Sequence, residues 1–411
     1  MRSLRRQLKE IVLGGTPVLR RKAIRVTQYF GQALLFLLLS PIVAVCFLLL
    51  ALIKRWVHIR FSYFKADRIG HYVFDFAHYC AERSIEASNR SIDLFFLERP
   101  GTNPYLDELV REKLYCFTWT FYFYHFARSI KPLRTFIFFP AIKTIGSRDV
   151  QGVLRHQPPF FRFNAVKQRL GEEFLLSKGI NPKKYAVLIV RDDAYLAARL
   201  GDFSYHSYRN SDIRDYEGLI RWLINKGYGV VRLGSTAETR AFEGIVPDGF
   251  LDYPFAEKKD PFLDVFIAAN ATVCISTGSG LDSLCDVNLV PILYLNYLPL
   301  AHFNSWSASA VTVPKILFRK SDNLTLSLHD YFRANYLRTD LYDKFDVSFD
   351  SLSTDQLVSA CKMFVEGRID EFAVDQGELI QLIAGDSKLS SLHSHTIEGK
   401  IVLPERLYGS A

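Results

Sequence analysis

The sequence predicts an α/β protein with two Rossmann-like, doubly wound domains and a membrane-embedded helix or re-entrant hairpin near its N-terminus. Three observations predict this fold. Short apolar runs typical of buried strands alternate with helical stretches along most of the 411 residues. The turns after these runs are rich in glycine, hydroxyl-bearing and charged residues, as ligand-binding turns of such sheets are. One uncharged run, 33–53, is long enough to cross a bilayer.

The first 68 residues carry the positive charge of the chain. They hold thirteen Lys and Arg against Glu10 and Asp67, a net +11, so the other residues sum to −3 within the chain's +8. A basic flank beside an apolar segment is typical of contact with an anionic membrane, and a slightly acidic body does not suit a nucleic-acid groove. We therefore expect a membrane partner and no nucleic-acid partner.

The apolar run 33–53 is hydrophobic on all sides, which favours membrane insertion over a buried core helix. Basic residues flank both ends, so the positive-inside rule does not orient it. Pro41 lies near its middle and can break a helix, which leaves a single span and a re-entrant hairpin both open. Residues 1–56 are thus expected to form a basic amphipathic arm followed by this membrane segment.

An N-terminal Rossmann-like domain is expected over 57–180. Its elements follow the order strand, helix, strand, helix, which is typical of an α/β fold. They are a strand over 57–64, a helix that ends at 86, a strand over 91–98 and helices within 105–130.

A C-terminal Rossmann-like domain is expected over 181–340, with a helical tail over 341–411 after it. Strands and helices again alternate, with short connections. The expected strands are 186–190, 229–234, 272–276 and 291–295, and the expected helices are 216–225, 262–270 and 281–287.

Ligands of doubly wound sheets bind beyond the carboxyl ends of the strands, so the turns there are candidate sites. The first candidate is the turn formed by Ser276, Thr277, Gly278, Ser279 and Gly280, which leads into a helix. Small residues let a backbone approach a ligand, and hydroxyls and a helix N-terminus donate hydrogen bonds to phosphate. The alternative is a tight turn capped by serine.

Arg191 is the second candidate, because it directly follows an apolar strand. A guanidinium held there can neutralise the charge that builds up on a departing phosphate without a metal ion. The alternative is a surface ion pair between Arg191 and Asp192 or Asp193.

The third candidate is the turn of Arg68, Ile69, Gly70 and His71. Gly70 permits a sharp turn, and an imidazole at the start of a helix can accept a proton near neutral pH. Asp75 lies one helical turn after His71 and could hold it as a partner. The alternative is a histidine that caps the helix or fills the core.

Several known motifs do not occur in the chain. It has no G-x-x-x-x-G-K-[ST], G-x-S-x-G, H-E-x-x-H or G-x-G-x-x-G, which excludes P-loop, α/β-hydrolase, zinc-protease and ordinary dinucleotide-binding classes. It also has no D-x-D, so a diphosphate site built on a chelated metal of that form is not predicted.

Several motifs follow one another along residues 57–335. They are Arg68–His71, Val190–Tyr195, Tyr208–Ile213 with Tyr216, Gly227–Gly234, Phe262–Asp264, and Thr277–Leu281 with Pro291 and Asn296. With these motifs in this order, the chain resembles a family of bacterial glycosyltransferases of cell-surface polysaccharide synthesis. The resemblance implies a two-Rossmann (GT-B) fold, with a nucleotide-sugar donor on the C-terminal domain and the acceptor on the N-terminal one.

The resemblance also implies roles for single residues. Arg191 and the 276–280 turn would hold the donor diphosphate, and Arg68, Gly70 and His71 would face the acceptor. A more distant likeness to fucosyltransferases also points at Arg191. The other expected donor-side residues are Asp192, Tyr208, Arg209, Asn210 and Gly234.

We therefore expect a membrane-associated glycosyltransferase at the cytoplasmic face of the bacterial inner membrane. It would move a sugar from a nucleotide-sugar donor to a lipid-linked or glycan acceptor, with His71 as base and with no cofactor and no metal ion. Two alternatives stay open: a noncatalytic membrane-bound protein that binds or assembles glycans, and a sugar-modifying enzyme that is not a transferase.

Overall fold

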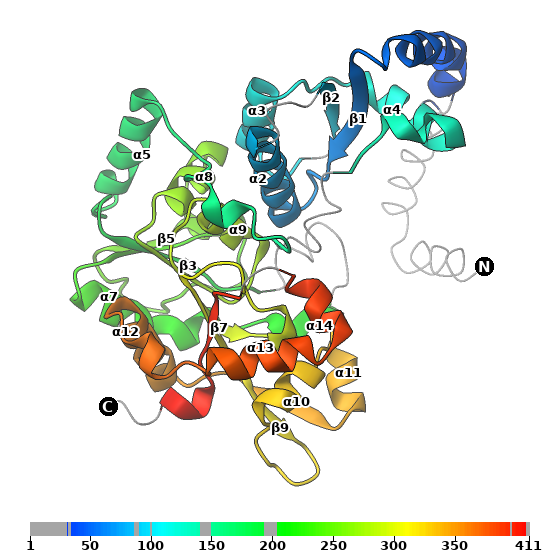
Figure 1. The fold of residues 1–411 in the computed structure, drawn as a ribbon. Coiled ribbons are helices and arrows are strands. Elements are labelled where there is room, and N and C mark those ends of the chain that lie inside the picture. The colour runs from blue at the N-terminus through cyan, green and yellow to red at the C-terminus, as the bar shows by residue number, and fades with distance from the viewer. Residues whose placement is uncertain are drawn as a thin grey trace, which may run out of the picture. The chain divides into compact units, whose positions relative to one another are not determined.

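The fold is described by a computed structural model, which covers residues 31, 34–85, 90–98, 101–139, 149–192, 204–394 and 397–407 (Figure 1). The predicted basic arm and Asp193 lie outside these residues. The chain divides into two compact units. We call them the small unit (1–63, 88–97 and 113–139) and the large unit (64–87, 98–112 and 140–411).

The small unit contains an apolar helix, Leu34–Ile53, with a mean hydropathy of 3.0. By length and composition it could cross a membrane, and it is the one helix of that kind among the described residues. It continues through Pro41, so the hairpin alternative is not formed there. The hydroxyl of Ser40 donates a hydrogen bond to the carbonyl of Phe36 (2.7 Å) in the turn next to the proline.

Two strands, β1 (His58–Phe64) and β2 (Ser91–Leu97), form a small sheet. The amide of His58 donates to the carbonyl of Arg90 (3.0 Å), so both strands begin at the same edge of the sheet. Single parallel bridges extend the sheet from β1 to Ile137 and from β2 to Cys116. The other helices of the unit are α4 (Thr120–Ser129) and the short η1 (Lys131–Phe136).

The large unit is built on a seven-stranded sheet in which every neighbouring pair is parallel. The order is β11-β8-β7-β6-β3-β4-β5. The strands are β3 (Tyr185–Ile189), β4 (Gly229–Arg232), β5 (Phe250–Asp252), β6 (Val273–Ser276), β7 (Ile292–Tyr297), β8 (Ala310–Pro314) and β11 (Lys400–Ile401).

The order of these strands reverses between β3 and β6. From β3 the chain continues outward to β4 and β5, and then returns to place β6 on the other side of β3. The carboxyl ends of β3 and β6 therefore flank a topological switch point, where open α/β sheets form their binding crevice.

Helices cover both faces of this sheet, since successive side chains point to opposite faces and all those of β3, β4 and β6 are buried. On one face, Ala186 and Leu188 pack in one core with Leu219 and Leu357 from α7 (Glu217–Asn225) and α12 (Thr354–Val365). On the other face, the hydroxyl of Tyr185 donates to the carbonyl of Ile267 (2.8 Å) in α8 (Pro261–Ala269). Figure 1 shows α7 and α12 together, apart from α8.

The remaining elements of the large unit complete its surface. They are α2 (Ile69–Ile85), α3 (Pro104–Lys113), α5 (Ala165–Ser177), α8 (Pro261–Ala269), α9 (Ser283–Asp286), α10 (Leu328–Arg333), α11 (Thr339–Lys344), α13 (Gln376–Ala384), α14 (Ser387–Leu392), and the hairpin of β9 (Ile316–Arg319) and β10 (Val347–Asp350).

The observed units differ from the expected ranges in two places. Helices α2 and α3, expected in a domain over 57–180, cluster with the large unit. The segment 341–411, expected as a helical tail, supplies β10 and the edge strand β11. The physical reason is burial: Ile401 of β11 is fully buried and its strand pairs with β8, so this segment completes the large sheet.

Candidate functional site

A pocket of about 450 Å³ lies in the large unit at the carboxyl ends of β3, β4, β6 and β7. Its walls are the turns that follow these strands, together with the first turn of α2. The pocket therefore occupies the switch-point position that the strand order defines.

The turn after β6 is held by hydrogen bonds to one carboxylate. Asp282 accepts from the hydroxyl of Ser276 (2.8 Å) and from the amide of Ser279 (2.8 Å). The hydroxyl of Ser276 in turn accepts from the amide of Gly278 (3.0 Å). Burial raises the pKa of Asp282 to about 6, and these hydrogen bonds oppose that rise. The turn is thus a rigid, internally bonded loop.

These bonds correct part of the sequence-based interpretation. Ser276 and Thr277 are buried and do not line the pocket, because their hydroxyls hold the protein's own backbone. Gly278, Ser279 and Gly280 do line it. The serine-capped turn that the sequence left as an alternative is therefore present, and the same turn also forms a wall of the pocket.

Both glycines of this turn are required by close contacts. Gly278 has a φ of +81°, and a Cβ there would lie 2.6 Å from the ring of Tyr297. A Cβ on Gly280 would lie 3.0 Å from the amide nitrogen of Gly70 at the start of α2. The turns expected on the donor side and on the acceptor side therefore touch each other through their backbones.

The helical stretch after the turn is short. It consists of η7 (Gly280–Asp282) and α9, so only a few peptide dipoles align behind the turn. The expected contribution of a helix N-terminus to phosphate binding is correspondingly small. Positive charge in the pocket must come mainly from side chains.

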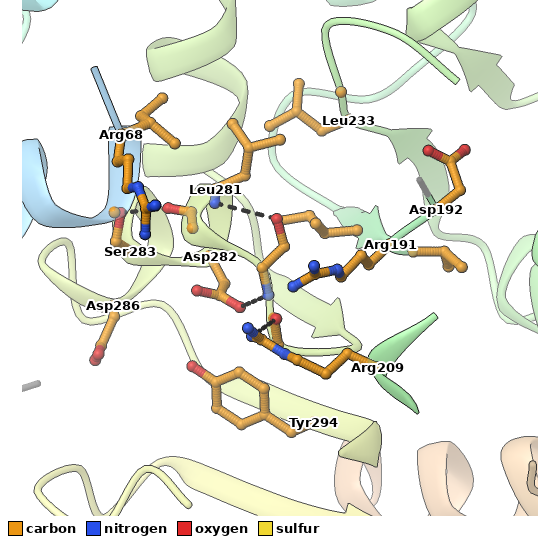
Figure 2. A pocket seen from close by; sticks show the side chains of 18 of the residues that line it. Arg68, Arg191, Asp192, Arg209, Leu233, Leu281, Asp282, Ser283, Asp286 and Tyr294 are labelled. Atoms are coloured by element: carbon orange, nitrogen blue, oxygen red, sulfur yellow. Dashed lines mark hydrogen bonds between the residues drawn. The ribbon is translucent and has the colours of Figure 1, made fainter. Parts of the chain in front are cut away.

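Arg191 is fixed by its backbone to the turn after β6. Its amide donates to the hydroxyl of Thr277 (2.9 Å), and its carbonyl accepts from the amide of Ser211 (3.0 Å). Figure 2 shows its guanidinium pointing toward the turn that carries Leu281 and Asp282. The structure therefore brings Arg191 and the 276–280 turn together, as the sequence-based hypothesis requires.

Asp192 points away from the pocket centre in Figure 2. Its carboxylate lies 3.6 Å from Nη2 of the buried Arg232 and accepts from the amide of Glu238 (3.1 Å). Its carboxylate thus anchors the neighbouring turn after β4. The structure gives Asp192 a structural role, and donor contact by this residue stays a prediction.

Four arginines line the pocket: Arg68, Arg191, Arg209 and Arg232. Arg232 is buried and paired with Asp192 and Asp252, which leaves the first three for a ligand. Arg209 ends the short helix η4 (Ser204–Arg209) and donates to the carbonyl of Gly278. The pKa of His206, which also lines the pocket, is lowered to about 4, first by burial and then by Arg191, Arg209, Arg68 and Arg338. All four of these guanidinium groups lower this pKa, so the charges around His206 are predominantly positive, which favours an anionic ligand.

His71 lines the pocket in the first turn of α2. Burial lowers its pKa, and the nearby charges of Lys65 and Arg68 lower it further. The imidazole is therefore neutral at pH 7, the form that can accept a proton. Asp75 is buried in α2 and does not line the pocket, so its pairing with His71 stays a prediction.

The other expected donor-side residues have different environments. Gly234 lines the pocket after β4. Tyr208 also reaches the lining, but its ring is almost fully buried against Tyr342, with centroids 5.4 Å apart. Asn210 does not line the pocket, and its carbonyl accepts from Nζ of Lys315 (2.7 Å). Direct ligand contact is therefore supported by geometry for Gly234 and not for Asn210.

Two carboxyl groups in the lining, the half-buried Asp264 and the buried Asp286, have no predicted role. Asp264 accepts from the amide group of Asn103 (3.3 Å), and burial raises its pKa to about 7. Asp286 accepts from Asn304 and from the indole of Trp306 (both 3.0 Å), and burial raises its pKa to about 7. Asp264 stands in the quoted motif Phe262–Asp264, which could have signalled it, whereas the partners of Asp286 are distant in sequence.

Among the residues that the structure describes, no group of three or more His, Cys, Asp or Glu side chains could hold a metal ion.

No protein-family model and no curated protein matches this chain. Two solved structures are similar to it. The ADP-heptose LPS heptosyltransferase II of E. coli shares 12% identity at a TM-score of 0.36, over 58% of this chain and 84% of that chain. A glycosyl transferase family 9 protein of Veillonella parvula shares 10% identity at a TM-score of 0.47, over 76% and 98%.

Proposed function

We propose that this chain is a glycosyltransferase that transfers a sugar from a nucleotide-sugar donor to a hydroxyl of a lipid-linked or glycan acceptor. One observation carries the proposal. The guanidinium groups of Arg68, Arg191 and Arg209 converge on a pocket beside a glycine-containing turn, at the switch point of a parallel sheet. A diphosphate is the ligand group that best fits such a site.

The donor chemistry follows from the charge of this pocket. When the bond between the sugar and the donor diphosphate breaks, negative charge grows on the departing phosphate oxygen. Arg191 and Arg209 are positioned to stabilise that charge, and a preorganised arginine does this without reorganisation during the reaction. A transfer that needs no metal ion is therefore part of the proposal, and retention of activity in a chelator would support it.

The acceptor chemistry is assigned to His71. A neutral imidazole takes the proton of the acceptor hydroxyl while the oxygen bonds to the sugar and the nucleoside diphosphate leaves. The lowered pKa of His71 keeps the imidazole neutral at pH 7. Asp75 is proposed as a positioning residue behind it.

A lipid-linked acceptor at the cytoplasmic face of the membrane is the finer part of the proposal. The apolar helix Leu34–Ile53 supports it, since a membrane-bound enzyme meets a lipid-linked acceptor at the bilayer surface. A free glycan acceptor would leave the role of this helix unexplained.

The experiment that tests the proposal is transfer from a panel of labelled nucleotide sugars to membrane lipid extract, with product analysis. Arg191→Ala should reduce kcat/KM by roughly a hundredfold to a thousandfold, as loss of one preorganised charged donor does. Arg191→Lys should restore part of the activity. Arg214→Ala is the matched control, because Arg214 is exposed and paired with Asp212 outside the pocket.

Two results would contradict the proposal. Turnover of Arg191→Ala equal to the parent would remove this residue from the reaction. Binding of finished glycan without transfer from any donor would favour the noncatalytic glycan-binding alternative.

A further inference from the structure

The small unit has an unusual surface for a folded protein. Along the helix Leu34–Ile53, large apolar side chains are exposed, and Leu37, Leu38, Leu48 and Leu52 are each between 66% and 69% exposed. Soluble proteins rarely expose a contiguous apolar face of this kind, which marks an interaction surface. The question is what covers it and in which geometry.

One face of this helix is already covered by the protein. Phe36, Leu39, Val43, Phe47 and Leu50 recur every three or four residues and so share one side of the helix. Phe36 contacts Phe126 of α4, and the other four belong to the aromatic core of the small unit. Phe47 is 2% exposed, and its ring lies 5.4 to 5.8 Å from four neighbouring rings.

The contact runs along the whole helix. At its end, Nζ of Lys54 donates to the hydroxyl of Thr135 (3.0 Å) and lies 5.2 Å from the ring centre of Phe136. The helix is therefore seated lengthwise on α4, β1 and η1, and only its opposite face is free.

This packing is incompatible with a helix that crosses the bilayer by itself, without the rest of the small unit. A crossing would carry β1 and α4 into hydrocarbon, including the ion pair of Arg60 with Asp93 (2.7 Å) and the exposed Arg128. Charged groups and open strand edges are costly at that depth. A helix that lies in the plane of the membrane buries its free face and leaves those groups at the surface.

The charge of the small unit fits an anionic surface. Among its described residues Asp93 is the single acid, and it is paired with Arg60. The basic residues there are Lys54, Arg55, Arg60, Arg90, Lys113, Arg128, Lys131 and Arg134. Such an excess attracts the headgroups of anionic lipids.

Exposed aromatic side chains also occur in the small unit. Trp56 follows the helix and is 55% exposed. The exposed Trp119 packs against Phe123, which contacts Phe47, and it stacks on the exposed Phe117. Indole rings favour the boundary between headgroups and hydrocarbon, so exposed tryptophans suit a unit that lies at a membrane surface.

From this geometry we infer that the small unit binds one leaflet of an anionic membrane through the free face of Leu34–Ile53, with the helix in the membrane plane and not across it. The inference does not depend on the reaction in the large unit. It requires that the chain segments before and after the helix remain on the same side of the membrane.

Vesicle flotation tests the contact with lipid. The purified full-length chain should float with phosphatidylcholine vesicles that contain phosphatidylglycerol, and less with phosphatidylcholine alone. The triple variant Leu38→Gln, Leu48→Gln, Leu52→Gln should lower the partition by about a hundredfold or more, because three exposed leucines no longer enter lipid. The matched control is Leu170→Gln, Leu176→Gln, Leu324→Gln, which changes exposed leucines of the large unit and should float like the parent.

Protease accessibility tests the geometry. Epitope tags at the two ends of the chain should be cleaved together in inside-out vesicles from expressing bacteria, and both protected in right-side-out vesicles. Cleavage of one tag in each vesicle type would show a crossing helix and overturn the inference. Unchanged flotation of the triple variant would also overturn it, as would a dimer in lipid-free solution that the triple variant dissociates, since a second copy would then cover the face.

Discussion

The two units use the same kinds of apolar residue in opposite ways. In the large unit, strands such as β3 are buried on both faces, and helices close the core around them. In the small unit, the most apolar element of the chain is buried on one side and exposed on the other. The difference teaches that hydrophobicity alone does not locate a core: the large unit encloses its apolar strands and contains an arginine-lined pocket, whereas the small unit leaves one face of an apolar helix exposed.

The largest expected effect is a loss of folding stability that is confined to the small unit. Phe47→Ala removes the ring at the centre of the aromatic core of the small unit and should destabilise that unit by about 3–5 kcal/mol. Hydrogen exchange followed by mass spectrometry should show faster exchange in β1, β2 and α4. The seven-stranded sheet should exchange as in the parent, and equal loss of protection there would show that the units unfold as one.

A smaller effect tests the rigid turn of the pocket. Gly278→Ala adds a Cβ against the ring of Tyr297 at a positive φ, so it should cost about 1–3 kcal/mol and weaken nucleotide binding. Gly249→Ala is a matched control, because Gly249 also has a positive φ (+84°) but open space around it. Thermal unfolding and nucleotide titration of both variants distinguish the effect of the Tyr297 contact from the effect of backbone strain. Equal losses in the two variants would contradict the role of the Tyr297 contact.

The smallest expected effect near neutral pH is the change of kcat/KM for sugar transfer with pH. A base acts in its deprotonated form, and the pKa of His71 is lowered from 6.5 by burial and by Lys65 and Arg68. The value of kcat/KM should therefore be level at and above pH 7 and fall on the acid side of His71's pKa, by about tenfold per pH unit. In His71→Gln this acid limb should disappear along with most activity, whereas His206→Gln should keep it. An acid limb that persists in the residual activity of His71→Gln would assign it to another group.

Sequence patterns predicted the local structure of the site better than its surroundings. The strands before Arg191 and Thr277 are short apolar runs that end in polar turns, and such runs are visible without knowledge of the fold. The prediction placed both turns at one crevice because parallel strands end at the same edge of a sheet. The observed hydrogen bond from Arg191 to Thr277 confirms that proximity.

Long-range packing set the limits of that prediction. The partners of Asp286 are Asn304 and Trp306, which follow after an intervening strand, and no local pattern links them. Hydroxyls in a turn suit phosphate, which predicts a ligand for Ser276 and Thr277, yet both hydroxyls bond to other groups of the protein. Helix α2 likewise belongs to the large unit because of its tertiary contacts, and the spacing of apolar residues along the sequence does not predict those contacts.

The central claim is that the pocket binds a diphosphate through its arginines, and calorimetric titration of nucleoside diphosphates into the full-length chain tests it most directly. We expect binding of at least one of ADP, GDP, UDP and dTDP, with no binding of the matching nucleoside. We also expect Arg191→Ala and Arg209→Ala each to weaken this binding by about tenfold or more, while Arg214→Ala does not. Equal binding of nucleoside and nucleoside diphosphate, or an unchanged affinity in both pocket variants, would contradict it.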